Sequence, residues 1–97
     1  MNKVRFHHEA QSEYEAAIAW YHARSPRAAI RFEAEVERVC DVIVHNPEIF
    51  ARYDELTRFA LLDRFPYSVI YLIDQSTIHI VAVAHASRAP GYWQGRI

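Results

Sequence analysis

Several features are scarce in this chain of 97 residues, and each scarcity excludes a class of protein. Cys40 is the only cysteine, so no disulfide can form within the chain, and we expect a reducing compartment, the cytoplasm. No apolar run approaches the roughly 20 residues that a membrane-spanning helix needs, so we expect no membrane partner. Two glycines and four prolines leave no flexible linker between parts. We therefore predict a single domain over residues 1–97.

Lysine is also nearly absent, since Lys3 is the only one. The formal net charge of −1 argues against a protein that coats nucleic acid through charge alone. The charge is unevenly spread, however, because residues 1–55 hold seven Lys/Arg and ten Asp/Glu, whereas residues 56–97 hold four arginines and two aspartates. No acid follows Asp74. An anionic target is expected to meet this C-terminal part.

The spacing of apolar residues predicts the order β-α-α-β-β-β. A period of two over residues 3–6 indicates a short strand, and spacings of three and four indicate helices over residues 9–24 and 26–46. Ser25 and Pro26 supply a cap and a first-turn proline for the second helix. Asn46 precedes a proline and ends it. Two helices joined so closely form an antiparallel hairpin.

Three further strands are predicted over residues 57–63, 67–74 and 77–85, with a short turn at residues 74–76. Strict alternation places Ile80 and Ala82 on one face of the last strand and Val81 and Val83 on the other. The predicted fold class is α+β, with the helical hairpin packed on one face of a largely antiparallel four-stranded sheet. Because the other face is apolar too, it is expected to need cover, which a partner protein could supply.

Short motifs occur along nearly the whole chain: AIAWY at residues 17–21, AxxF at 29–32, NP at 46–47, RFPY at 64–67 and HASRAPGYW at 85–93. Together they resemble the ParE-like, plasmid-stabilisation branch of the RelE/ParE superfamily of toxins. The resemblance implies the toxin component of a bacterial type II toxin-antitoxin system, which arrests growth and is neutralised by a cognate antitoxin. It implies contact with DNA only indirectly, through an antitoxin complex.

The resemblance leaves the target open, because ParE-like members poison DNA gyrase, whereas RelE-like members cleave messenger RNA on the ribosome. By position, the catalytic residues of such a ribonuclease would be His85, Arg88 and Tyr92, which could move protons and stabilise charge at a phosphate. Ser68 stands where many of these nucleases have an arginine, and their lysines are absent. We therefore expect a gyrase inhibitor rather than an enzyme. A ribonuclease and an inactive antitoxin-binding module are the alternatives.

The residues expected to bind the target lie in the C-terminal half: Arg58, Arg64, His85, Arg88, Tyr92 and Trp93. Arg58 and Arg64 would share one side of a strand and extend a basic face with Arg88. A type II turn over residues 89–92 would aim Tyr92 and Trp93, although packing of these rings on the sheet explains them more simply. Arg96 is interpreted as a frayed terminal charge.

Six histidines raise the question of a metal site, but their spacing argues against one. His79 and His85 lie about 20 Å apart if both are on one strand, and His7 and His8 point to opposite sides if they continue the first strand. We expect no metal and no cofactor. Cys40 is interpreted as a buried, inert thiol, and Trp20 and Tyr21 as core residues.

Overall fold

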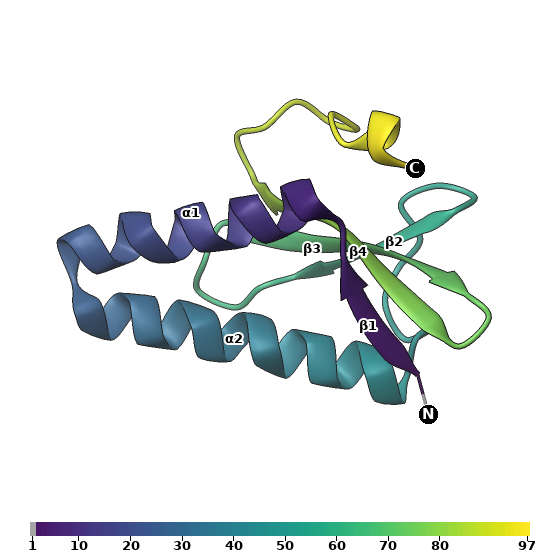
Figure 1. The fold of residues 1–97 in the computed structure, drawn as a ribbon, viewed down its shortest axis with the longest axis horizontal. Coiled ribbons are helices and arrows are strands. Elements are labelled where there is room, and N and C mark those ends of the chain that lie inside the picture. Colours follow the sequence, from purple (N-terminus) through teal and green to yellow (C-terminus); the bar gives the residue numbers. More distant parts are fainter. Residues whose placement is uncertain (1) are drawn as a thin grey trace.

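In the computed structural model, which describes residues 2–97, two helices cover one face of a four-stranded sheet (Figure 1). The elements are β1 (Lys3–Phe6), α1 (His8–Arg24), α2 (Pro26–His45), β2 (Thr57–Leu61), β3 (Tyr67–Asp74), β4 (Thr77–His85) and the 3-10 turn η1 (Gln94–Arg96). The strand order is β1-β4-β3-β2, in which β1 runs parallel to β4 and the other pairs are antiparallel. The predicted fold class and order of elements are confirmed.

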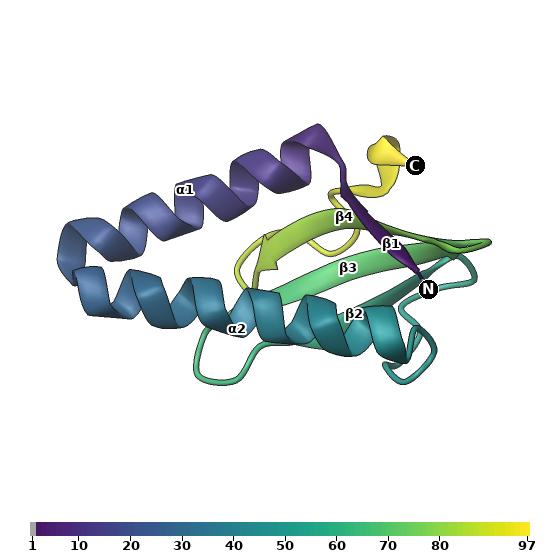
Figure 2. The ribbon, with the colours of Figure 1, turned by 60° about the horizontal axis from the view of Figure 1, so that its bottom comes forward.

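The two helices begin and end where the sequence signals predict. His7 caps α1 by accepting a hydrogen bond from the Glu9 N–H at 3.1 Å, and Ser25 caps α2 by accepting one from the Ala28 N–H at 3.3 Å. Because Ser25 also ends α1, the helices run antiparallel from a tight junction, which lies far from both termini in Figures 1 and 2. Among residues 2–97, no helix is long and apolar enough to cross a membrane.

The core between the helices and the sheet is centred on Phe32 of α2. The ring is fully buried, and its centroid lies 5.1 to 5.3 Å from those of Tyr21, Phe65 and Tyr67. Trp20 was expected in the core as well, but 51% of it is exposed. That expectation is wrong because Trp20 lies at the edge of the inward face of α1, where its ring packs against Tyr21 rather than into the core.

A β-bulge changes which side chains of β4 face the helices. Ile70 pairs with Ala82 while Tyr71 pairs with Ile80, so Val81 is an extra residue on β4. Ile80 and Val83 therefore both join the core under the helices, whereas Val81 and Ala82 lie on the opposite face of the sheet. The strict alternation predicted for this strand is wrong, because a single extra residue shifts every later side chain to the other face.

The chain's own C-terminal segment covers part of the sheet face opposite the helices. It leaves the end of β4 (Figure 1) and ends near the start of α1, where Arg96 contacts Glu9 and Glu13. The predicted type II turn is present, since Gly91 has a φ of 72° and the Tyr92 N–H donates to the Ala89 carbonyl at 3.2 Å. Trp93 is only 2% exposed and packs with Ile70, Val81 and Ala82. The expected need for cover is thus partly met within the chain.

The second strand is shorter than predicted, which separates two arginines expected to act together. β2 ends at Leu61, and Arg64 has a φ of 69°, a left-handed conformation that no strand residue adopts. Arg64 therefore lies in a loop, and the prediction of a shared strand face with Arg58 is wrong. The Arg58 guanidinium instead donates to the carbonyls of Glu48 at 3.1 Å and Phe50 at 2.7 Å, which holds that loop against β2.

Cys40 lies beside the buried stripe of α2 and is only partly buried. Burial raises the pKa of its thiol to about 11, and the Glu37 carboxylate contributes in the same direction. The thiol is therefore protonated at neutral pH, and protonated thiols are weak nucleophiles.

Candidate functional site

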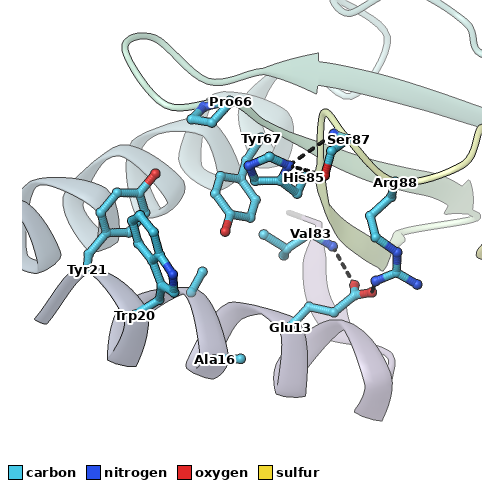
Figure 3. A pocket seen from close by; sticks show the side chains of 11 residues that line it. Glu13, Ala16, Trp20, Tyr21, Pro66, Tyr67, Val83, His85, Ser87 and Arg88 are labelled. Carbon is cyan, nitrogen blue, oxygen red and sulfur yellow. Dashed lines mark hydrogen bonds and ion pairs between the residues drawn. The ribbon is translucent and has the colours of Figure 1, made fainter. Parts of the chain in front are cut away.

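A cavity of about 440 Å³ opens between α1 and the end of β4 (Figure 3). We call it the α1–β4 groove, and it is lined by Glu13, Ala16, Ala17, Trp20, Tyr21, Pro66, Tyr67, Val83, His85, Ser87 and Arg88. Its volume lies in the range of roughly 300 to 1,000 Å³ that is usual for ligand pockets. It also contains His85 and Arg88, two of the residues predicted from sequence.

The groove exists because β1 is short and one face of α1 carries small residues. β1 pairs with β4 only as far as Ile80, so the outer edge of β4 beyond that point has no neighbouring strand. The α1 residues that line the groove follow helical spacings of three and four, which places them on one side of the helix. Ala16 and Ala17 lie between the larger Glu13 and Trp20 and leave the floor open.

Glu13 accepts a backbone hydrogen bond at this edge that a neighbouring strand would otherwise accept. Its Oε1 accepts hydrogen bonds from the Val83 N–H and from Arg96 Nη1, both at 3.0 Å. Its Oε2 accepts from the Tyr92 hydroxyl at 2.7 Å and from Arg96 Nη2 at 2.8 Å. Arg96 Nη1 also donates to the Val81 carbonyl at 3.0 Å. The Glu13–Arg96 pair thereby satisfies backbone groups that an unpaired strand edge would expose.

These contacts set the protonation of the two acidic groups involved. Burial raises the pKa of Glu13, but hydrogen bonds from Arg96, Tyr92 and Val83 outweigh it and leave that pKa below its ordinary value. Burial raises the pKa of Tyr92 well above its usual range, and the hydrogen bond to Glu13 raises it further. At neutral pH the carboxylate is charged and the phenol keeps its proton.

The prediction that Arg96 is a frayed terminal charge is wrong. Its side chain is only 10% exposed and lies 3.5 Å from a Glu9 carboxylate oxygen in addition to its bonds with Glu13. Sequence reasoning missed Glu13 as well, although one signal was present. Glu13 lies three residues after Ala10 and four before Ala17, so this acid falls on the buried stripe of α1, where a charge needs a partner.

Arg88 is held at the mouth of the groove and keeps free hydrogen-bond donors. Its guanidinium carbon lies 3.7 Å from the centroid of the Tyr92 ring, over one face of that ring. The nearest Glu13 oxygen is also 3.7 Å away, a distance that gives an ion pair without a hydrogen bond. About half of the side chain is exposed, and within residues 2–97 its guanidinium donates no hydrogen bond.

His85 closes β4 by hydrogen bonding to the turn that follows. Its Nδ1 accepts from the Ser87 N–H at 3.0 Å and lies 2.8 Å from the Ser87 hydroxyl. The ring packs edge-on against Tyr67, with centroids 5.0 Å apart. Because Nδ1 accepts, the neutral ring carries its proton on Nε2. His85 thus has a structural role whether or not it also contacts a partner.

The predicted site residues divide into those that the structure brings together and those that it separates. His85, Arg88 and Tyr92 gather at the end of β4, and Glu13 joins Arg88 to Tyr92. Trp93 is buried, so a target cannot reach it while the C-terminal segment is in place. Arg58 is turned onto its loop, and Arg64 lines a different cavity, beside Glu35 and Asp63.

The first two histidines lie side by side, because they do not continue the first strand, which was the condition under which they would point apart. β1 ends at Phe6, and the rings of His7 and His8 stack with centroids 4.4 Å apart. With Glu9 they form the one set of three or more His, Cys, Asp or Glu residues in the described part of the chain whose ligand atoms all lie within 4.8 Å of one another. However, His7 Nδ1 already accepts the helix-cap hydrogen bond, and Glu9 lies beside Arg96. We assign no metal to this group.

Comparison with known proteins gives one family and one fold. The family model described as "ParE toxin of type II toxin-antitoxin system, parDE" matches residues 4–90. A solved structure, titled "Chromosomal ParDE TA system from P. aeruginosa", is similar with a TM-score of 0.72 and 19% sequence identity, covering 88% of this chain and 96% of that chain. At this identity the likeness supports the fold alone. No curated protein matches the chain.

Proposed function

Because this chain belongs to the ParE toxin family of type II toxin-antitoxin systems, we propose that it inhibits growth by binding DNA gyrase and that a cognate antitoxin neutralises it. The proposal places the protein in the bacterial cytoplasm and gives it the role of an inhibitor that binds another protein, rather than that of an enzyme. Family membership supports the toxin class, and the geometry of the groove supports binding over catalysis.

The observation that carries binding over catalysis is the hydrogen bond of the Tyr92 hydroxyl to the Glu13 carboxylate. A ribonuclease needs a group that exchanges protons near neutral pH and a cation free to stabilise a phosphate. The Tyr92 hydroxyl is bound to the Glu13 carboxylate, and its raised pKa keeps it protonated. Tyr92 is therefore not available as the proton-transfer group of such an enzyme. A protein surface is the better ligand for such a site.

Two assays on one preparation test this proposal. The purified protein is expected to inhibit supercoiling by gyrase and to leave ribosome-bound message intact. Arg88→Ala is expected to weaken gyrase inhibition roughly tenfold, as for one well-placed interface arginine. The control is Arg27→Ala, which removes the same charge from the exposed first turn of α2 and is expected to change nothing.

Two other outcomes would each favour one of the alternative functions. Cleavage of message that falls by roughly 10² to 10⁴ in His85→Ala would establish the ribonuclease alternative, because that loss is typical of a proton-transfer group. Failure of the protein in both assays, with the fold intact, would leave an inactive antitoxin-binding module.

A further inference from the structure

We propose that a second cavity, beside the β1 edge of the sheet, binds a nucleotide through its phosphate. This cavity has a volume of about 420 Å³ and is lined by Arg5, Phe6, His7, Leu72, His79, Ile80, Val81, Arg96 and Ile97. We call it the β1–β4 pocket. Its lining comes from β1, β3, β4, the residue that caps α1 and the C-terminal segment, which lies near the start of α1 (Figure 1). The inference goes beyond the proposed function, because it concerns another ligand and other residues.

The register of the sheet places an arginine and a histidine side by side in this pocket. Arg5 of β1 pairs with His79 of β4, and His79 pairs with Leu72 of β3. The residues on either side of Arg5 and of His79 pack in the core under the helices. Because successive side chains of a strand point to opposite faces, Arg5 and His79 both lie on the face away from the helices.

The pocket offers hydrogen-bond donors that the protein itself does not use. Within the described residues 2–97, the side chains of Arg5 and His79 make no hydrogen bond and no ion pair. His7 Nδ1 accepts the cap bond from the Glu9 N–H, so the neutral ring carries its proton on Nε2. Arg96 is already satisfied by its bonds within the chain and serves as a wall. Three donor side chains from separate segments are therefore available to a ligand.

The charges of the pocket select an anion. No Asp or Glu is among the described residues that line it. Glu9, which adjoins His7, lies outside the lining, and its carboxylate is 3.5 Å from Arg96 Nε. The Arg5 guanidinium matches the oxygens of a phosphate bidentately, and the two imidazoles can each donate to a further oxygen. A terminal phosphate has three such oxygens, whereas a carboxylate has two, so phosphate is the better match for three donor side chains.

The rest of the lining suits the base of a nucleotide. Leu72, Val81 and Ile97 are apolar, and the β-bulge turns Val81 onto this face of the sheet. Bulges are common beside binding sites, because the extra residue re-aims a side chain. A planar base can pack on such an apolar surface and on an imidazole ring. Inorganic phosphate alone would leave this surface in water, and the pocket volume is ordinary for a small organic ligand.

Titration of the isotope-labelled, full-length protein with thymidine monophosphate, followed by NMR, tests the proposal. The largest changes in chemical shift are expected at the amides of residues 5–7 and 79–81. Arg5→Gln removes the charge and is expected to weaken binding roughly tenfold. His79→Phe keeps a ring but removes its donors, and the expected loss is roughly threefold or more.

Matched controls are Arg27→Gln and His22→Phe, which make the same changes at exposed positions of the two helices and should leave binding unchanged. Melting temperatures establish that each variant is folded. Thymidine, which lacks the phosphate, and inorganic phosphate, which lacks the base, should each bind at least roughly tenfold more weakly than the nucleotide. A short oligothymidylate distinguishes two sources of the ligand: tighter binding through the same residues identifies a nucleic-acid strand, and equal binding identifies a free nucleotide.

No binding at millimolar nucleotide, equal binding of inorganic phosphate, or chemical-shift changes confined to other surfaces would overturn the proposal. So would an acidic peptide that binds more tightly than the nucleotide and loses affinity in Arg5→Gln, because the ligand would then be a protein carboxylate. The readout involves neither gyrase nor an antitoxin. Failure of this inference therefore leaves the proposed function as it stands, and failure of gyrase inhibition leaves the pocket as it stands.

Discussion

Phe32→Ala is expected to lower the free energy of unfolding by about 3 to 5 kcal/mol, the usual cost of removing a buried aromatic ring. Phe32 is fully buried, and rings from α1 and from the start of β3 pack around it. Its loss leaves a cavity that three elements border and that none can fill without moving. Two of the surrounding rings, Tyr21 and Tyr67, also line the α1–β4 groove, so the change should loosen the groove as well.

Urea denaturation followed by circular dichroism measures the effect. Ile30→Ala is the control, because this side chain lies on the same helix but is 68% exposed, and it is expected to change stability by less than about 0.5 kcal/mol. Equal stability of Phe32→Ala and the wild-type protein would contradict the placement of the hairpin on the sheet.

Glu13→Gln is expected to cost about 3 kcal/mol, at the lower end of the range for breaking a buried ion pair from one side. The substitution preserves the size of the side chain. It removes the carboxylate that accepts hydrogen bonds from both terminal nitrogens of Arg96, whose side chain is only 10% exposed. The C-terminal segment should detach more readily and expose Trp93. The expected signs are faster hydrogen exchange at the Val83 amide and a red shift in tryptophan fluorescence.

The matched control is Glu15→Gln on the exposed side of α1, which should change stability by less than about 0.5 kcal/mol. If Glu13→Gln and Glu15→Gln have the same stability and the same exchange rates, the ion pair does not hold the C-terminal segment in place.

The stability that Glu13 contributes should depend on pH in the acid range. Its folded-state pKa is lowered, so the contribution is fully present above the ordinary value of 4.5 and is lost as the pH falls through the lower folded value. Below pH 4.5, the difference in free energy of unfolding between the wild-type protein and Glu13→Gln should therefore shrink. Measuring this difference, rather than the wild-type stability alone, cancels the titration of the other acids. A constant difference down to strongly acidic pH would contradict the assignment.

The toxin class followed from short motifs, and the family match over residues 4–90 confirms it. The gyrase target and the roles of His85, Arg88 and Tyr92 in binding it stay predictions. The match ends at Pro90, so Tyr92, Trp93 and Arg96, which close the sheet and hold Arg88 in place, lie beyond the matched residues. The features that distinguish this site therefore lie partly outside the residues that the family model matches.

The sequence by itself determined the parts of the molecule that depend on near neighbours in the chain. Ser25 and Pro26 begin α2, Gly91 permits the turn before Tyr92, and the spacing of apolar residues gives the helices their inward faces. Each of these features depends on contacts within a few residues, and short-range rules are sufficient to predict them.

Only the tertiary structure decided how the edge of β4 is closed. The bulge at Val81 depends on the register with β3, and Glu13 meets an arginine 83 positions later in the chain. No local pattern relates such distant residues. Their pairing arises because β1 ends early, which leaves backbone groups on β4 that must be hydrogen bonded, and the folded chain places Glu13 and Arg96 where they can do so. That closure holds Trp93 against the face of the sheet and Arg88 at the groove.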